Sequence, residues 1–368
     1  MATNNTINNA FGDNYTGPNK VSKNVIIGGD FGLNPWQRGV SGAASGLNFY
    51  IADRFFTSQV GTIALCTGSK AADAPTVSEA KYYTSSSLLY TVTTADASVD
   101  AADIIYIGHR IEGYNWAPLY TRPFVVSFWA KSNITGIYSF TVSDNSEANG
   151  YISEYTIVAA NTWQFFSFAI PANTTGGTWQ FTTSAGLRMN WVLMAGSNST
   201  SSTLNTWGVN KRASTNQVNC VGTIGNTFQL ALVQLEAGSI ATPFELKTRQ
   251  EVLAECQRYY AKTFPQGTTP AQNTGSTVGA LIYNSSAISI YRATAFQCPV
   301  QMRTYATFTF YNPGAANSNW RNITDGADSG PSATLSSSQV IVYVNNIQTV
   351  TDGAGDILAI HATANAEL

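Results

Sequence analysis

Two histidines, His109 and His361, limit the nucleophilic catalysis that this sequence could support. A Ser-His-Asp or Cys-His site would have to be built around one of them. His109 lies beside Arg110 and close to Glu112 in an expected strand, where a histidine more often has a structural role. The sequence also lacks the G-x-S-x-G, HExxH and P-loop motifs. We therefore expect no catalysis by these routes.

Paired carboxylates are the other route to catalysis, because glycoside hydrolysis uses two of them at a set separation. The candidates are Asp103, Glu112, Asp144, Glu147 and Glu154. Their spacing does not place any two at that separation, so hydrolysis is a minor alternative. The turn from Asp144 to Glu147 could offer oxygens to Ca²⁺, but it lacks EF-hand spacing and fits a polar hairpin turn better. We expect no enzyme, no metal and no cofactor.

Aromatic residues are the remaining chemical resource, because flat rings bind the C–H faces of sugars. Trp179 in TTGGTWQ and Trp320 in ANSNWRN lie in polar, turn-rich sequence and are the two predicted ligand contacts. Trp36 and Arg38 in NPWQRG are expected to shape a turn and cap the core. The other tryptophans are weaker candidates, since a sandwich core also uses such residues: Trp116, Trp129, Trp163, Trp191 and Trp207.

The composition of the 368 residues favours a rigid β-protein. Hydrophobic residues make up 44% and charged residues only 11%, with a formal net charge of −2. The usual charged share is about 25%, so no basic face for nucleic acid is expected. No apolar run reaches the roughly 18 residues that would span a bilayer. The start MATNNTINNAFGDN has neither a cationic beginning nor an apolar centre, so we expect synthesis in a cytoplasm without a signal peptide.

The four cysteines are far apart and without C-x-x-C spacing, which predicts small buried side chains and no metal or disulfide framework: Cys66, Cys220, Cys256 and Cys298. Residues 1–22 are rich in Asn and Thr and show no periodicity. Such a segment cannot order itself by burial. It is either a loose tail or a peptide that anchors to a partner, and the anchor hypothesis names Asn4, Thr6, Ile7 and Phe11.

Residues 23–247 contain short alternating segments separated by Gly, Asn, Ser and Thr turns. In FVVSFWAKS, Phe124, Val126, Phe128 and Ala130 fall on one face. This pattern predicts an antiparallel sandwich, most simply a jelly roll. Residues 265–368 hold further short strands and are expected to form a smaller β-domain. The predicted fold class is therefore all-β, with one short helix between the two parts.

That helix is expected at residues 248–264. Thr248 and Glu251 form a capping-box pattern, and Pro265 ends the segment. Its apolar residues recur every three or four positions: Val252, Leu253, Cys256, Tyr259 and Tyr260. This stripe could pack on the sandwich or on equivalent helices about a threefold axis. The threefold arrangement uses Val252, Leu253, Cys256 and Tyr260 and predicts a homotrimer.

The phrase QLEAGSIATPFE at 234–245, followed by EVLAECQRYYAKTF, resembles a signature in tail-fibre and other virion proteins of tailed bacteriophages. NVIIGGDFGLNPWQRG, FYIADRF, IGHRIEGYNWAPL, FVVSFWAKSNITGIYSFTV and PVQMR are similar to further segments of that family. The resemblance implies a jelly roll similar to carbohydrate-binding modules, carried on virion fibres that are commonly trimeric. It supplies no shared catalytic residues.

These observations together predict a non-enzymatic structural fibre protein of a bacteriophage virion, made in the host cytoplasm. It would be a tail fibre or adhesin that contributes to recognition of host-surface polysaccharide. Its first 22 residues would insert into other virion proteins, and it would contact neither nucleic acid nor the membrane interior. A capsid head fibre, a decoration protein or an adaptor without ligand is the alternative, and a glycan depolymerase is a weaker one.

Overall fold

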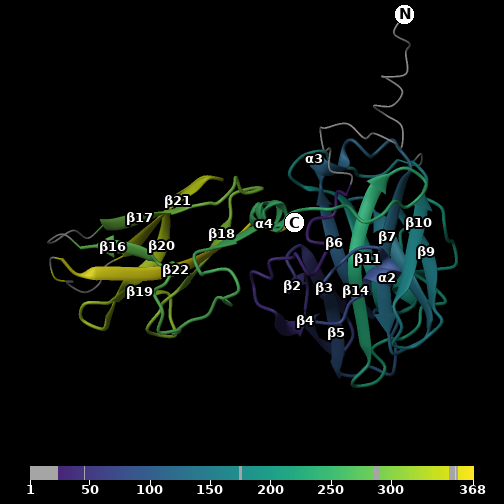
Figure 1. Cartoon of the computed structure of the whole chain (residues 1–368), viewed down its shortest axis with the longest axis horizontal. Helices are drawn as coiled ribbons and strands as arrows, with labels where there is room; N and C mark the ends of the chain where they lie inside the picture. The colour runs from purple at the N-terminus through teal and green to yellow at the C-terminus, as the bar shows by residue number, and fades with distance from the viewer. Residues whose placement is uncertain (1–23, 45, 174–175, 286–290, 348–352, 354) are drawn as a thin grey trace, which may run out of the picture.

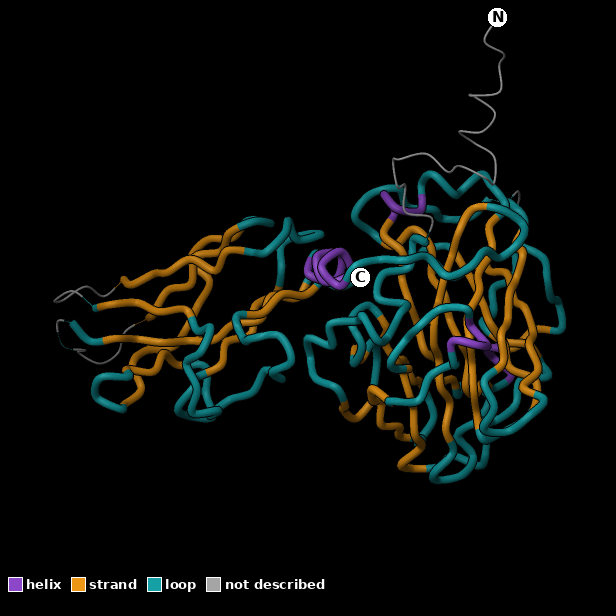
Figure 2. The backbone as a smooth tube through the Cα atoms, viewed as in Figure 1, coloured by secondary structure: helices purple, strands orange, loops and turns teal. Residues whose placement is uncertain are grey.

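The computed structural model describes residues 24–44, 46–173, 176–285, 291–347, 353 and 355–368. Strands dominate, and they form two units with a helix at their junction (Figures 1 and 2). The larger unit consists of two six-stranded antiparallel sheets, and the smaller unit is built around one eight-stranded sheet. The predicted fold class, an antiparallel jelly-roll sandwich followed by a short helix and a smaller β unit, is confirmed.

One sheet of the sandwich has the order β1-β4-β5-β14-β7-β10. Its strands are β1 (Ser41–Ala44), β4 (Leu65–Ala71), β5 (Ser87–Thr94), β14 (Thr227–Ala237), β7 (Phe124–Ser132) and β10 (Gln164–Ile170). The other sheet has the order β2-β3-β6-β11-β8-β9. Its strands are β2 (Phe49–Tyr50), β3 (Phe55–Val60), β6 (Ile104–Glu112), β11 (Ala185–Ala195), β8 (Gly136–Ser143) and β9 (Gly150–Ile157). The connections carry the helical turns α2 (Val77–Ala80), α3 (Gly113–Trp116) and η1 (Ser197–Ser199), and the short parallel pair β12 (Thr200–Ser201) and β13 (Ala213–Ser214).

Aromatic side chains from both sheets fill the space between them. The alternation in β7 places Phe124, Val126, Phe128 and Ala130 in this core, as predicted. The ring of Phe128 meets the ring of Trp191 edge-on, with centroids 5.6 Å apart. Burying a side chain of this size stabilises the fold by about 1.5–3 kcal/mol. The sandwich core is therefore built from alternating inward residues of its strands.

The segment after β14 carries the chain out of the sandwich. Gly238 adopts φ +127°, a conformation that favours glycine, directly after the strand ends at Ala237. Phe244 then packs edge-on against Tyr82, with centroids 4.9 Å apart. This contact fixes the crossing segment on the sandwich before the helix begins.

The helix α4 runs over Arg249–Gln257 and starts with the predicted capping box of Thr248 and Glu251. It is shorter than the expected 248–264. Tyr260–Lys262 form strand β15, which pairs with residues 363–365. The prediction was wrong there because a distant strand offers this aromatic stretch a β ladder, which the local pattern could not show.

The apolar stripe of α4 packs within the same chain. Val252 and Cys256 are buried with Ile27 and Tyr259, and Leu33 and Leu368 pack against this cluster. Tyr260 is also buried, while Leu253 is half-buried. Val252, Cys256 and Tyr260 are therefore occupied within the chain and are not available for the predicted threefold contact, whereas a contact through Leu253 stays a prediction. The four cysteines are buried and free, as predicted.

In the smaller unit, the longest ladder runs β15-β22-β19-β20-β21-β17, and β16 and β18 also pair with β22. These strands are β22 (Ile357–Asn365), β19 (Asn319–Asn322), β20 (Ala327–Ser337), β21 (Ile341–Ile347), β17 (Tyr291–Gln297), β16 (Leu281–Asn284) and β18 (Thr307–Tyr311). β22 is central because it pairs with four other strands. Its alternate residues Leu358, Ile360, Ala362 and Ala364 supply much of the small core.

Charged side chains join the two units. Glu367 accepts hydrogen bonds from Arg54 and Arg38 of the sandwich. Arg258, at the end of α4, donates to both oxygens of Glu112, at 2.7 and 2.9 Å. A bidentate pair of this kind fixes orientation as well as distance. Buried and partly buried ion pairs therefore contribute to the relative placement of the two units.

Candidate functional site

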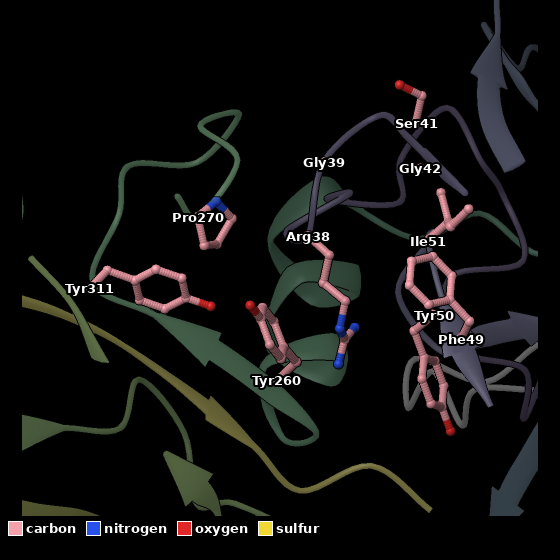
Figure 3. A pocket seen from close by; sticks show the side chains of 10 residues that line it. All are labelled: Arg38, Gly39, Ser41, Gly42, Phe49, Tyr50, Ile51, Tyr260, Pro270 and Tyr311. Carbon is pink, nitrogen blue, oxygen red and sulfur yellow. The ribbon is translucent and has the colours of Figure 1, made fainter. Parts of the chain in front are cut away.

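A pocket of about 250 Å³ lies at the junction of the two units (Figure 3). The stretch between Trp36 and β3 forms one wall, and β15, the loop after it and β18 form the other. Its lining combines several aromatic rings with one guanidinium and two glycines: Arg38, Gly39, Ser41, Gly42, Phe49, Tyr50, Ile51, Tyr260, Pro270 and Tyr311. Small-molecule pockets usually enclose about 300–1,000 Å³, so this one suits a small ligand or one unit of a longer one.

Arg38 organises the pocket from its centre. Its guanidinium lies 3.8 Å from the ring centroid of Tyr260 and 5.0 Å from that of Tyr50 (Figure 3). It also contacts Asp53 at 3.4 Å and Glu367 at 3.2 Å. These contacts neutralise the cation and hold both rings in place. The pocket therefore presents ordered aromatic faces with little free charge.

The hydroxyls of Tyr50 and Tyr260 keep their protons at neutral pH. Burial raises the pKa of Tyr50 to about 12, and Glu367 adds to this effect. Burial likewise raises the pKa of Tyr260 to about 12. The Tyr50 hydroxyl donates to the main-chain oxygen of Leu368 at 3.1 Å. Neutral hydroxyls beside flat rings offer hydrogen bonding together with apolar contact, the combination that polyols require.

Phe49 and Tyr311 form the outer rim. Phe49 is 37% exposed, and its ring lies against Gly42. Tyr311 is half-buried and packs edge-on against Phe264, with centroids 5.4 Å apart. Both rings are held by neighbours yet reach solvent. They can therefore contact a ligand without a large rearrangement.

Trp179, one of the two predicted ligand contacts, lies elsewhere, in an aromatic cluster. It is half-buried and stacks on Trp116 with centroids 5.5 Å apart. Tyr120 and Trp207 contact the same ring, and the indole N–H donates to the oxygen of Gly176 at 2.7 Å. These contacts show that Trp179 contributes to packing. Its role in binding a ligand stays a prediction.

Trp320, the other predicted contact, is a core residue. It is 1% exposed, and its indole N–H donates to the oxygen of Asn345 at 3.1 Å. The prediction of ligand contact was wrong. The polar sequence around Trp320 forms a turn and the ends of β19, whereas alternation along the strand turns the indole inward. The proposed anchor residues Asn4, Thr6, Ile7 and Phe11 lie outside the described residues.

The candidate carboxylates have structural partners. Glu112 binds Arg258 and Tyr259, while Glu147 binds Arg188 and Arg212. Asp144 accepts hydrogen bonds from the main-chain N–H groups of Ala148, Asn149 and Thr178. Glu154 accepts from Ser214 and Asn216, and Asp103 accepts from the N–H of Asp100. Within the described ranges, no group of three or more His, Cys, Asp or Glu residues is arranged to hold a metal ion.

His109 is buried in the sandwich core. Its Nε2 donates to the oxygen of Ile27 at 3.3 Å, and its ring packs edge-on against Phe55. Burial, together with the charge of Arg54, holds the pKa of His109 well below its ordinary value of 6.5. The native state therefore keeps the neutral form, which fits a structural role.

This burial predicts a loss of stability in acid. Below pH 6.5 the unfolded chain binds a proton at His109 that the native chain does not, so stability falls as pH falls. Between pH 7 and 5.5 the cost from this group is about 1 kcal/mol. Urea unfolding of the native chain and of His109→Gln, each at pH 7 and pH 5.5, measures this loss of stability. Equal pH dependence in the two proteins would contradict this account.

Sequence reasoning missed most of the pocket. The pattern around Arg38 indicates only a turn, and the spacing around Tyr260 indicates a helical stripe. Phe49, Tyr50 and Tyr311 carried no local signal for a binding site, since aromatic residues within strands are common. The one available signal was the polar, aromatic composition as a whole.

No family model and no curated protein matches the chain. Among solved structures, it is similar to the enzymatically active domain of tailspike protein 4 from bacteriophage CBA120, with 15% identity and a TM-score of 0.32. That match covers 59% of this chain and only 22% of the tailspike chain.

Carbohydrate-binding modules are also similar. TmCBM61, in complex with beta-1,4-galactotriose, is 11% identical with a TM-score of 0.30, over 59% of this chain and 100% of that chain. The family 11 module of Lic26A-Cel5E from Clostridium thermocellum is 10% identical with a TM-score of 0.29, over 54% and 95%. At this level of similarity, no binding residue or activity is transferred to this chain.

None of the helices in the described part of the chain is both long enough and apolar enough to cross a bilayer.

Proposed function

We propose that this chain is a structural protein of a bacteriophage virion that recognises glycans on the host surface. The observation that carries glycan recognition is the junction pocket, where ordered aromatic rings and neutral hydroxyls surround Arg38. Sugars pair apolar C–H faces with hydroxyl groups, and this lining complements both. The hinge phrase QLEAGSIATPFE and the helix after it support virion membership.

The proposal includes binding without catalysis. The carboxylates considered for hydrolysis are engaged with arginines, hydroxyls or main-chain amides. Incubation with host polysaccharide should therefore release no new reducing ends. Homotrimeric assembly remains part of the proposal, but it would use a surface other than the buried residues of α4. Sedimentation of the purified chain tests it.

Glycan binding is tested by removing one rim ring. Tyr311→Ala takes away an aromatic face while leaving Arg38 and its ion pairs in place. Loss of such a contact is expected to weaken binding about tenfold, since 1.4 kcal/mol corresponds to a factor of ten. The measurement is a screen of bacterial surface glycans, followed by titration calorimetry on the strongest binder.

The matched control is Tyr343→Ala, because Tyr343 is 43% exposed on β21 and does not line the pocket. It should bind as the native chain does. Native-like binding by Tyr311→Ala, or no binding of any glycan by the native chain, would contradict the proposal that the junction pocket binds glycans. Immunogold labelling of intact virions with antibody to residues 265–368 then separates a tail fibre from a capsid head fibre or decoration protein.

A further inference from the structure

A second group of polar side chains lies on the outer face of the sheet β2-β3-β6-β11-β8-β9. In β11, Met189 and Trp191 point into the core, so Arg188 and Asn190 point outward. Arg110 of β6 lies directly opposite Arg188 in the register of the two strands. Like charges placed directly opposite in a sheet are destabilising. Each guanidinium has its own acceptors, since Arg110 donates to the main-chain oxygen of Leu368 and to Asn48, while Arg188 donates to Glu147 and Asn145.

Arg212 reaches the same face from the segment that crosses it. The main-chain oxygen of Arg212 accepts a hydrogen bond from Thr141 of β8. Its guanidinium and that of Arg188 both contact one carboxylate, Glu147. The side chains of Arg188 and Arg212 remain 24% and 34% exposed. This part of the face is therefore open to solvent.

Hydrogen-bond donors on this face are incompletely used. Among the described residues, the Nε atoms of Arg110, Arg188 and Arg212 have no hydrogen-bond partner, nor does the Nδ2 of Asn190, which is 2% exposed. A buried donor without a partner costs about 1–3 kcal/mol. Burial lowers the pKa of Arg188, and burial together with the charge of Arg188 lowers that of Arg110. The face therefore offers more donor capacity than the chain's own acceptors fill.

Glu147 occupies the centre of this arrangement in a strained conformation. Its φ is +60°, a region that non-glycine residues seldom adopt. The Nη1 of Arg188 donates to it at 2.7 Å, and the Nη2 of Arg188 donates to Asn145 at 3.3 Å. The nearby Asp144 and Glu154 accept from other donors. Glu147 thus supplies the one carboxylate that the guanidiniums of Arg188 and Arg212 share.

We propose that Arg188, Arg212 and Asn190 bind the anionic group of an acidic polysaccharide, a carboxylate or a sulfate ester, in place of Glu147. Guanidinium forks match both groups in bidentate geometry. The inference rests on the proposed function in taking a glycan as the ligand class. Its site is separate from the junction pocket, because the lining of that pocket contains none of these three residues.

The test compares oligosaccharides of polygalacturonate and of dextran sulfate with neutral galactan of equal length. The native chain should bind an acidic probe more tightly, with an affinity that falls as salt rises. Arg188→Gln and Arg212→Gln should each bind the acidic probe about tenfold more weakly, since each substitution removes a charge-assisted contact. Glu147→Gln should instead bind a few times more tightly, because the competing carboxylate is gone while the fold is kept.

The matched control is Arg249→Gln, which removes an exposed cation at the start of α4 and should change nothing. The response to carboxylate and sulfate probes identifies which anionic group is used. Three results would each overturn the site: no acidic probe binds, neutral galactan binds equally well, or the arginine variants bind normally while melting like the native chain. Tyr311→Ala separates the two proposals, because it should weaken binding in the junction pocket and leave this acid preference intact.

Discussion

Replacing Glu367 by Met is expected to lower the free energy of unfolding by about 3–5 kcal/mol, the usual cost of breaking a buried ion pair from one side. The side chain of Arg54 is 1% exposed, and Glu367 is its acidic partner across the junction. Burial alone would lower the pKa of Arg54, yet Glu367 together with Tyr259, Tyr50 and Cys256 raises this pKa above its ordinary value. The variant would leave a guanidinium buried against the ring of Tyr259, 3.6 Å from its centroid. Urea unfolding measures the loss.

The double variant Arg54→Met with Glu367→Met completes the test. Removing both charges should recover much of the stability, because a buried pair replaced by apolar side chains is often close to neutral. Glu255→Gln is the control, since the pair of Lys247 and Glu255 is more exposed and should be worth below about 1 kcal/mol. A loss under 1 kcal/mol for Glu367→Met would show that the junction does not depend on this pair.

Replacing Trp320 by Ala is expected to destabilise the smaller unit by about 3–5 kcal/mol, the range for deleting a large buried aromatic side chain. Trp320 is packed in the same core as Phe296, Val344 and Leu358, and this core is small. The cavity and the lost hydrogen bond to Asn345 should act together. Hydrogen exchange of β19 and β22 should rise well before that of the sandwich, because the two units have separate cores.

Tyr343→Ala is the control in the same unit, and as a largely exposed change it should cost no more than about 1 kcal/mol. The result also decides between two roles for Trp320. A core role predicts lost stability in the absence of any glycan. Unchanged stability together with lost glycan binding would instead restore the role that the sequence had suggested.

The sequence by itself determined the all-β class and the start of the helix. The alternation in β7 correctly predicted which of its side chains point into the core. The capping box of Thr248 and Glu251 lies where it was predicted. Both depend on residues only a few positions apart. Interactions between residues so close in the sequence form in much the same way in any tertiary context, so they can be predicted from the sequence.

Only the tertiary structure decided where the helix ends and what the candidate sites contain. Tyr260 joins a strand because residues 363–365 lie beside it, about a hundred positions further along the chain. The junction pocket combines residues 38–51 with Tyr260 and Tyr311, and Trp320 is turned into a core by its strand partners. Burial and pairing between distant segments set these outcomes. No local pattern encodes them, because they depend on which segments meet when the two units pack.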